Sequence, residues 1–297
     1  MTTDYEIGFL ARIFEASDGL KLYARDYGHD NPLTADRPTV FCLPGLTRNS
    51  RDFHQLALIL SSDTIAPRRV ITLDARGRGL SGWDDDKSRY NLSVEAADVL
   101  SACAIFDVPE AVFIGTSRGG LVLHLLATQR PDILKSVILN DIGPALEVEG
   151  LAEIRDYLNS DRRPVSWDDA AAIIRANHGD SFTILNDEDW LDMCHAIYAD
   201  IDGKVTADFD AAIAQQMTAL DLSRPLPTLW EQFDAFGGIS LMTIRGENSK
   251  LLSVETLAEM GKRHPGMLAK TAIGQGHAPI LHLDDLPSAI QSFLSAS

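Results

Sequence analysis

The chain has 297 residues, enough for one large domain or two modest ones, and 45% of them are hydrophobic, which suffices for a sizeable core. Its 26 basic and 43 acidic residues give a net charge of −17, which argues against nucleic acid or an anionic membrane surface as the main partner. No apolar run reaches the roughly 18 residues that span a bilayer, and the N-terminus lacks a secretory signal. The three cysteines are scattered, which indicates buried thiols. We therefore expect a cytoplasmic protein.

The first two predicted elements are strands. Residues 9–14 and 20–27 alternate between apolar and polar side chains, and Asp18-Gly19 forms a turn between them. Short continuous apolar runs then alternate with helical patterns. The runs cover 39–43, 70–73, 111–114 and 136–139, and the helical patterns cover about 51–61, 93–106 and 118–129. Continuous apolar strands separated by helices predict a parallel sheet with helices on both faces.

This alternation stops near Gly143-Pro144 and returns only after about residue 235. The intervening segment shows only helical patterns, broken by short polar stretches. The later elements are strands at 240–244 and 267–273 and helices at 253–262 and 286–294. We therefore predict an α/β core formed by residues 1–144 and 236–297, with an all-helical cap, residues 145–235, inserted between its two parts.

One stretch crowds small residues around a serine where a strand becomes a helix. Ser117 is the centre of Gly115-Thr116-Ser117-Arg118-Gly119. A Gly-x-Ser-x-Gly turn in this context holds the serine in a strained backbone conformation at the carboxyl edge of the sheet, and the following helix directs N–H groups to the same place. We expect Ser117 to be a nucleophile; the alternative is a purely structural turn.

A serine hydroxyl needs a base to become a good nucleophile. His277 is the candidate, because it lies in GQGHAPIL after the last predicted strand, in a loop at the same edge of the sheet. His124 falls inside the helix after Ser117 and is expected to be packed, and the other histidines show no partner pattern. The sequence contains no CxxC, HxH or HExxH, so we expect no metal ion and no cofactor.

The chain resembles an α/β-hydrolase of the helical-cap type over nearly its whole length. The motifs that carry the resemblance are LPGLTRN at 43–49, DARGRGLS at 74–81, GTSRGG at 115–120, LNDIGP at 139–144, RGENS at 245–249 and GQGHAP at 274–279. The resemblance implies an eight-stranded, mostly parallel sheet, a cap over the active site, and a Ser–acid–His triad in that chain order.

The resemblance also implies an oxyanion hole formed by two backbone N–H groups. Relatives often have His-Gly where this chain has Pro44-Gly45, and Pro44 has no N–H to donate. By position, the donors are therefore the N–H groups of Leu46 and Arg118, unless the glycine only makes a turn. The Arg118 side chain either points into the pocket, where it would attract a carboxylate, or forms an ion pair elsewhere.

The loop at 74–82 also matches a dinucleotide-binding fingerprint, with Gly77, Gly79 and Gly82 in the required spacing. That fingerprint needs a helix to begin immediately, so that its N-terminus can hold pyrophosphate. Here the acid-rich sequence WDDDKSRYN follows instead and would repel phosphate. We expect Asp74 and Arg76 to hold this loop together by hydrogen bonds and ion pairs.

The triad acid departs from the family pattern. Members usually carry an aspartate three residues after the glycine that ends the strand at 240–244, and this chain has Ser249 three residues after Gly246. A minority of the family draws the acid from the loop after the preceding strand, where this chain has Asp141. We predict Asp141 as the acid, within about 2.6–3.2 Å of His277. Glu247 is the alternative, and a third possibility is that the chain has no true acid.

These features predict a serine hydrolase that cleaves an ester, a lactone, a thioester or a C–C bond beside a ketone in a small molecule. Relatives that act on alkyl halides or epoxides use aspartate at the elbow, so the serine argues against those reactions. The alternatives are a ligand-binding or receptor-like protein with little turnover and, less favoured, a cofactor-free haloperoxidase or oxygenase. No sequence feature indicates an oligomeric state. The cap is expected to cover Ser117 and to line the pocket with one or more of Trp167, Trp190, Met193 and Trp230.

Overall fold

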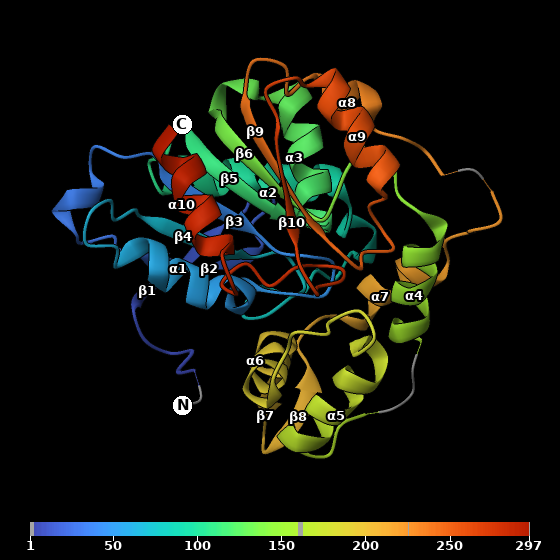
Figure 1. Ribbon diagram of the computed structural model, residues 1–297. Coiled ribbons are helices and arrows are strands. Elements are labelled where there is room, and N and C mark those ends of the chain that lie inside the picture. Colours follow the sequence, from blue (N-terminus) through green and yellow to red (C-terminus); the bar gives the residue numbers. More distant parts are fainter. Residues whose placement is uncertain (1–2, 160–162, 225, 297) are drawn as a thin grey trace.

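The computed structural model describes residues 3–159, 163–224 and 226–296. Eight strands form one central sheet in the order β1-β2-β4-β3-β5-β6-β9-β10 (Figure 1). Strand β2 runs antiparallel to β1 and β4, and the other neighbouring pairs are parallel. The strands are β1 (Phe9–Glu15), β2 (Lys21–Tyr27), β3 (Thr39–Leu43), β4 (Val70–Asp74), β5 (Ala111–Thr116), β6 (Leu134–Asn140), β9 (Ser240–Gly246) and β10 (Leu268–Ala272).

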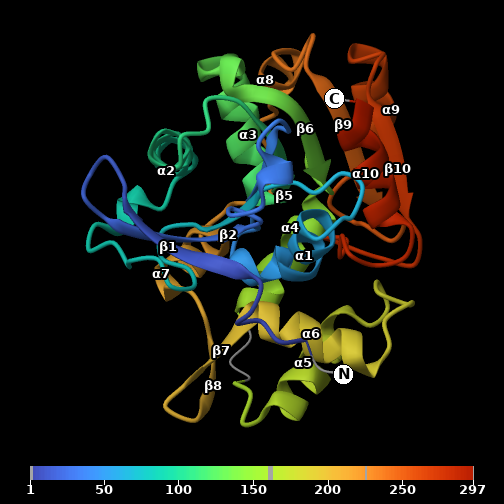
Figure 2. The same cartoon turned by 90° about the vertical axis from the view of Figure 1, so that its left-hand side faces the viewer.

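Helices cover both faces of the sheet. Along β3, Phe41 and Leu43 belong to one apolar cluster and Val40 and Cys42 to the other, as the period of two in a strand requires. The first cluster is closed by α2 (Leu92–Ile105), α3 (Arg118–Gln129) and α9 (Val254–Arg263), and the second by α1 (His54–Ser61) and α10 (Leu286–Ala296). Figure 2 shows α2 and α3 on one side of β5, with α1 and α10 on the other. The predicted α/β fold class is therefore confirmed.

The segment between β6 and β9 contains α4 (Val148–Leu158), α5 (Trp167–His178), α6 (Asp187–Ile197), α7 (Ala211–Thr218) and α8 (Trp230–Asp234). The prediction that this insert is all-helical was wrong. Strands β7 (Tyr198–Ile201) and β8 (Lys204–Ala207) form a small antiparallel sheet. Their turn is Asp202-Gly203, in which both residues have positive φ, 53° and 76°. Asp-Gly is a strong hairpin signal, which the sequence analysis had treated as a helix break.

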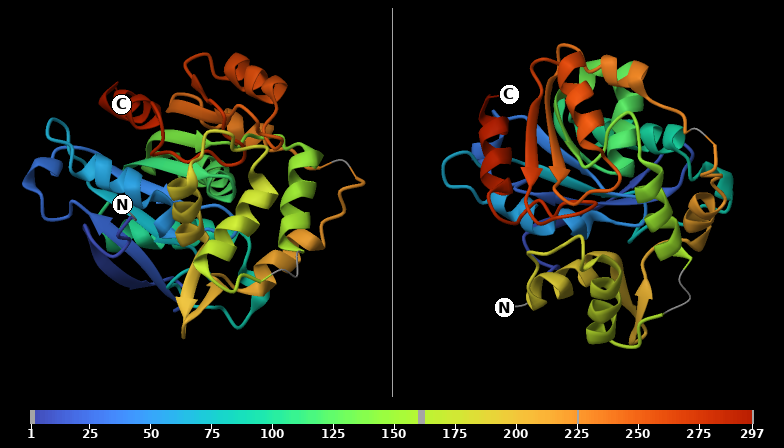
Figure 3. Two further views of the ribbon diagram at one scale, coloured as in Figure 1. Left: turned by 60° about the horizontal axis from the view of Figure 1, so that its bottom comes forward. Right: turned by 45° about the vertical axis from the view of Figure 1, so that its right-hand side comes forward.

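The insert lies across one end of the sheet (Figures 1 and 3). It is tied to the loop after β4, because the N–H of Gly79 donates to the carbonyl of Asp208 (2.9 Å) and the N–H of Asp210 donates to that of Gly77 (2.7 Å). Helix α8 behaves differently, since it packs against α3 and contributes Phe233 to the first core cluster. Within the described ranges, none of the helices combines the length and apolar character needed to cross a bilayer.

The close approach of α3 to β3 gives a stability prediction. An alanine β-carbon at Gly119 would lie 2.2 Å from the backbone oxygen of Leu43, so Gly119→Ala must displace the helix from the sheet. We expect this change to lower the free energy of unfolding by about 1–3 kcal/mol, the usual cost of overpacking. Urea denaturation measures the difference.

The matched control is Gly261→Ala in α9. Its β-carbon would meet only the methyl carbon of Met267, at 3.9 Å, so we expect stabilisation by about 0.5–1 kcal/mol through the loss of glycine flexibility. Equal effects of the two substitutions would contradict the argument from close packing.

Candidate active site

Ser117 lies at the sharp junction between β5 and α3. Its backbone has φ 49° and ψ −113°, a conformation that side-chain-bearing residues rarely adopt. The strand and helix approach so closely that a β-carbon at Gly115 would lie 2.7 Å from the nitrogen of Gly120. The N–H of Ser117 donates to the carbonyl of Asn140 at the end of β6, 3.1 Å away. The geometry of the predicted elbow is present, and it directs the hydroxyl to the carboxyl edge of the sheet.

His277 connects this serine to an acid. Its Nε2 lies 2.9 Å from Oγ of Ser117, and its Nδ1 lies 2.8 Å from Oδ2 of Asp141. A carboxylate beside Nδ1 fixes the proton on that nitrogen, which leaves Nε2 as the acceptor for the serine hydroxyl. The three side chains therefore stand in the hydrogen-bonded order that nucleophilic catalysis requires, and the predicted distance between Asp141 and His277 is found.

The carboxylate of Asp141 is fully buried and has further donors from the loop after β9. Its Oδ1 accepts the N–H of Gly246 at 2.8 Å, and its Oδ2 accepts the hydroxyl of Ser249 at 2.6 Å. The backbone N–H of Asp141 in turn donates to the carbonyl of Ile244, 2.7 Å away. Ser249, at the family's usual acid position, thus donates a hydrogen bond to Asp141, the predicted acid.

The structure does not bring the alternative acid to His277. Glu247 is exposed, and its Oε2 accepts the N–H of Gly274 at 2.8 Å. The loop that carries His277 is held by Asn140, whose side chain donates to the carbonyl of Pro279 at 3.0 Å. The sequence analysis missed Asn140, although it is the residue before Asp141 in the motif LNDIGP.

The two proposed oxyanion donors flank Ser117. Within the described residues, the backbone N–H groups of Leu46 and Arg118 have no protein acceptor, and Arg118 is the first residue of α3. A β-carbon at Gly45 would lie 3.7 Å from Cβ of Ser117, so the loop after β3 passes close to the nucleophile. The Arg118 side chain points away and pairs with Glu95 at 2.7 Å, which is the ion-pair alternative of the sequence analysis.

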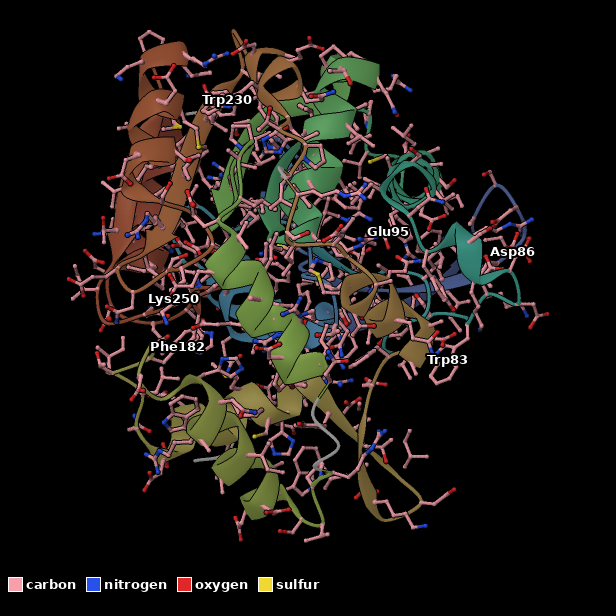
Figure 4. The ribbon with its side chains drawn as sticks, turned by 90° about the vertical axis from the view of Figure 1, so that its right-hand side faces the viewer. Trp83, Asp86, Glu95, Phe182, Trp230 and Lys250 are labelled. Atoms are coloured by element: carbon pink, nitrogen blue, oxygen red, sulfur yellow. The ribbon has the colours of Figure 1, made fainter. Side chains whose placement is uncertain are left out.

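A cavity of about 120 Å³ opens above Ser117 and is lined by both the core and the insert. Its core residues are Gly45, Leu46, Thr47, Arg48, Asp52, Thr116, Ser117, His277 and Ala278; its insert residues are Ile154, Tyr157, Leu158, His178, Phe182, Met193 and Ile197. Figure 4 shows Phe182 where the insert meets the core. The expectation that the insert covers Ser117 is therefore confirmed.

The insert also contributes the expected apolar lining, and of the four residues named for it Met193 reaches the cavity while the three tryptophans do not. Trp167 lies against His195 with 4.0 Å between the ring centroids and the rings tilted by 31°, and Trp190 is buried in the apolar centre of the insert. Trp230 packs against the first core cluster, at the end of the molecule far from the body of the insert (Figure 4). The three tryptophans of the insert therefore pack within it or against the core and do not line the cavity, whereas Tyr157 and Phe182 do.

Arg48, Asp52 and His178 are polar residues of the cavity wall that were not predicted. Arg48 follows the oxyanion loop in LPGLTRN, and its Nε donates to Oδ1 of Asp52 at 2.8 Å. His178 ends α5, and burial, reinforced by the charge of Arg48, lowers its pKa to about 4. His178 is therefore neutral at pH 7. The motif that holds Arg48 was a usable signal, whereas His178 reaches the site only through the packing of the insert.

The loop after β4 has the structural role expected for it. Asp74 accepts the backbone N–H groups of Ser50 (2.6 Å) and Leu80 (2.8 Å), and Arg76 is paired with Asp98 at 2.6 Å. These contacts confirm that Asp74 and Arg76 hold the loop together. In the part of the chain that the structure describes, no group of three or more His, Cys, Asp and Glu residues is arranged to hold a metal ion.

Comparison with known proteins agrees with this geometry. Residues 38–186, half of the chain, match the family model of the alpha/beta hydrolase fold. The chain belongs to the α/β-hydrolase family. A crystal structure of an alpha/beta hydrolase from Novosphingobium aromaticivorans is 35% identical, covers 98% of this chain and 99% of its own, and superposes with a TM-score of 0.88.

Two curated relatives of this α/β-hydrolase are named for their activities. The 3-hydroxybutyrate-oligomer hydrolase of Cupriavidus necator is 29% identical over 82% of this chain and 84% of its own length. The 2-(acetamidomethylene)succinate hydrolase of Mesorhizobium japonicum is 25% identical over 81% of each. Both relatives are hydrolases, and they act on different compounds.

The contacts of Asp141 predict how much its substitution lowers kcat. Asp141→Asn keeps the shape of the side chain but removes the charge that orients His277, so we expect kcat to fall by about 10⁴. Glu247→Gln is the control and should leave kcat within about twofold, because the Glu247 side chain accepts the backbone N–H of Gly274 and is not hydrogen-bonded to His277. Steady-state kinetics on both variants measures the difference, and a larger loss for Glu247→Gln would contradict the assignment.

Proposed function

We propose that this protein is a serine hydrolase that cleaves the ester of a small carboxylic acid through an acyl-enzyme. The observation that carries the proposal is the hydrogen-bonded chain from Ser117 through His277 to Asp141 at the base of a cavity. A receptor-like protein has no need for a histidine aligned between a strained serine and a buried acid. Lactones, thioesters and C–C bonds beside a ketone use the same acyl chemistry and belong in the substrate screen.

In the proposed mechanism, Nε2 of His277 accepts the proton of Ser117 as its oxygen attacks the substrate carbonyl carbon. Asp141 stabilises the imidazolium that results. The N–H groups of Leu46 and Arg118 donate to the oxyanion of the tetrahedral intermediate. His277 then protonates the leaving alcohol as the C–O bond breaks, which leaves the acyl group on Ser117. A water molecule, deprotonated by His277, attacks the acyl carbon and releases the acid and the free serine.

The cavity favours a short acyl group. An apolar cavity of about 150 Å³ holds a benzene molecule, so the space of about 120 Å³ above Ser117 fits an acyl chain of a few carbons. Apolar insert residues, including Phe182, Met193 and Ile197, form most of the upper wall. Activity should therefore decline as the acyl chain lengthens.

The position of Arg48 supports the proposal that the substrate is negatively charged. It is the only lysine or arginine among the described residues that line the cavity. Its Nε and Nη2 both contact one oxygen of Asp52, and its Nη1 has no partner in the described parts of the chain. A free guanidinium N–H can donate to a substrate carboxylate. The compounds in the names of the two curated relatives are carboxylic acids, which supports the same proposal.

The nucleophile is tested by labelling and by substitution. A fluorophosphonate probe should label the protein on Ser117, and Ser117→Ala should lose the label and about 10⁶ in kcat, as in other enzymes that lose the serine of such a unit. The substitution removes one partly exposed hydroxyl, so the thermal unfolding midpoint should change little. Near-normal hydrolysis of p-nitrophenyl acetate by the variant would overturn the assignment.

The charge of the substrate is tested by Arg48→Met. A hydrogen bond to a charged group contributes about 1.5–3 kcal/mol, so kcat/KM for the half-ester p-nitrophenyl succinate should fall about 10- to 100-fold. The neutral ester p-nitrophenyl butyrate serves as the control within the same variant and should keep its kcat/KM within about threefold. An equal loss for both esters would mean that Arg48 shapes the pocket without recognising charge.

A further inference from the structure

The two proposed oxyanion donors come from segments that are far apart in the sequence. Leu46 follows β3, and Arg118 begins α3. Both segments are connected to the same buried side chain, Glu95 on α2, and each connection passes through an arginine. Figure 4 labels Glu95 beside α2 and α3, on the core side of the molecule rather than in the insert.

The first connection reaches the loop of Leu46. Arg78 comes from the loop after β4, and its side chain is completely buried. Its Nε donates to the carbonyl of Leu46 at 2.7 Å, and its Nη1 donates to Oε1 of Glu95 at 2.9 Å. The carbonyl and the N–H of Leu46 belong to adjacent peptide planes, so holding the carbonyl restricts the direction of the N–H.

The second connection reaches the helix that begins at Arg118. Nε of Arg118 donates to Oε2 of Glu95 at 2.7 Å, and its Nη2 donates to the carbonyl of Tyr90 at 3.3 Å. Each oxygen of Glu95 therefore accepts from a different arginine. The carboxylate bridges the segment of one oxyanion donor to the segment of the other.

The burial of this cluster makes the bridge stiff. Glu95 is only 5% exposed, and burial by itself would raise its pKa, but the charges of Arg78 and Arg118 outweigh that effect and lower the pKa below its ordinary value. The carboxylate is therefore ionised at neutral pH. Its loss would leave two guanidinium groups in a buried place without their shared anion, which is strongly unfavourable.

We propose that Glu95 is a positioning residue that sets the spacing of the two oxyanion N–H groups. This inference rests on the proposed serine-hydrolase function. Oxyanion donors act over a narrow range of about 2.7–3.1 Å from the developing charge. A small relative shift of the two segments therefore weakens binding of the transition state more than it weakens binding of the substrate. Loss of the bridge should therefore lower kcat and leave KM nearly unchanged.

The substitution Glu95→Gln breaks the bridge while keeping its shape. The amide oxygen can accept from one arginine, but the amide NH₂ then faces the N–H donors of the other. Asp98→Asn provides a matched control. Asp98 lies on the next turn of α2, is also 5% exposed, and pairs with Arg76 from the same loop as Arg78. The side chain of Arg76 also pairs with Asp18 and Asp84, and only its backbone carbonyl, which accepts from Nη1 of Arg78 at 2.8 Å, touches the bridge in the described residues.

The experiment measures kcat and KM for p-nitrophenyl acetate, and the inhibition constant of a short alkylboronic acid, whose tetrahedral adduct with a serine mimics the intermediate. Removal of one oxyanion donor costs about 10²–10³ in kcat, so its displacement in Glu95→Gln should cost about 10- to 100-fold, with KM within about twofold. Boronic acid affinity should fall by a similar factor. Asp98→Asn should keep kcat and the boronic acid inhibition constant within about threefold, even if its melting temperature falls as much as that of Glu95→Gln.

Equal losses of kcat in the two variants, or a loss in Glu95→Gln that resides in KM, would overturn the positioning role. If Glu95→Gln does not fold, Glu95→Asp applies the same criteria, because it keeps the charge but is too short to reach both arginines. Failure of the proposed function is separate, since it would leave the unsubstituted protein without ester hydrolysis and without labelling on Ser117. An active, labelled protein whose folded Glu95 variants keep their kcat would refute only this inference.

Discussion

The carboxylate of Asp141 is the point on which the proposed catalytic centre depends. It stands at the end of β6, is fully buried, and accepts hydrogen bonds from Gly246, Ser249 and His277. A buried charge without such partners would cost several kcal/mol, so the loops after β9 and β10 must both be in place to supply these hydrogen bonds. The orientation of His277 toward Ser117 follows from this one arrangement.

Ser249 explains how the chain can carry its acid at an unusual place. It occupies the position where relatives usually have the aspartate, and its hydroxyl donates to Asp141 at 2.6 Å while accepting the N–H groups of Leu251 and Leu252 at 3.2 Å. A second carboxylate at that distance would put two negative charges in one buried site, and one of them would take up a proton. A neutral donor at residue 249 is therefore the complement of an acid at residue 141.

The core elements, the elbow and Asp141 could be predicted because each depends on local pattern or on sheet topology. Neighbouring parallel strands end at one edge, so an acid after β6 had to lie near a histidine after β10. The hairpin β7-β8 could have been predicted from the turn residues Asp202-Gly203, but the helical patterns around them favoured a helix. His178 could not be found, since the packing of α5 against α6 within the insert, and not any motif, brings it to the cavity. The same holds for the tryptophans of the insert, whose periodicity does not distinguish packing within the insert from contact with the pocket.

The groups proposed to react and most of the cavity wall come from different parts of the structure. Ser117, His277, Asp141 and the two oxyanion segments belong to the core, where Asp141 contacts His277 and Glu95 contacts Arg118. The insert supplies much of the cavity wall but none of these groups. Substitutions on the inner face of the insert can therefore change the shape of the pocket without disturbing the hydrogen bonds of the core. This division accounts physically for hydrolases that share this fold and yet act on different compounds.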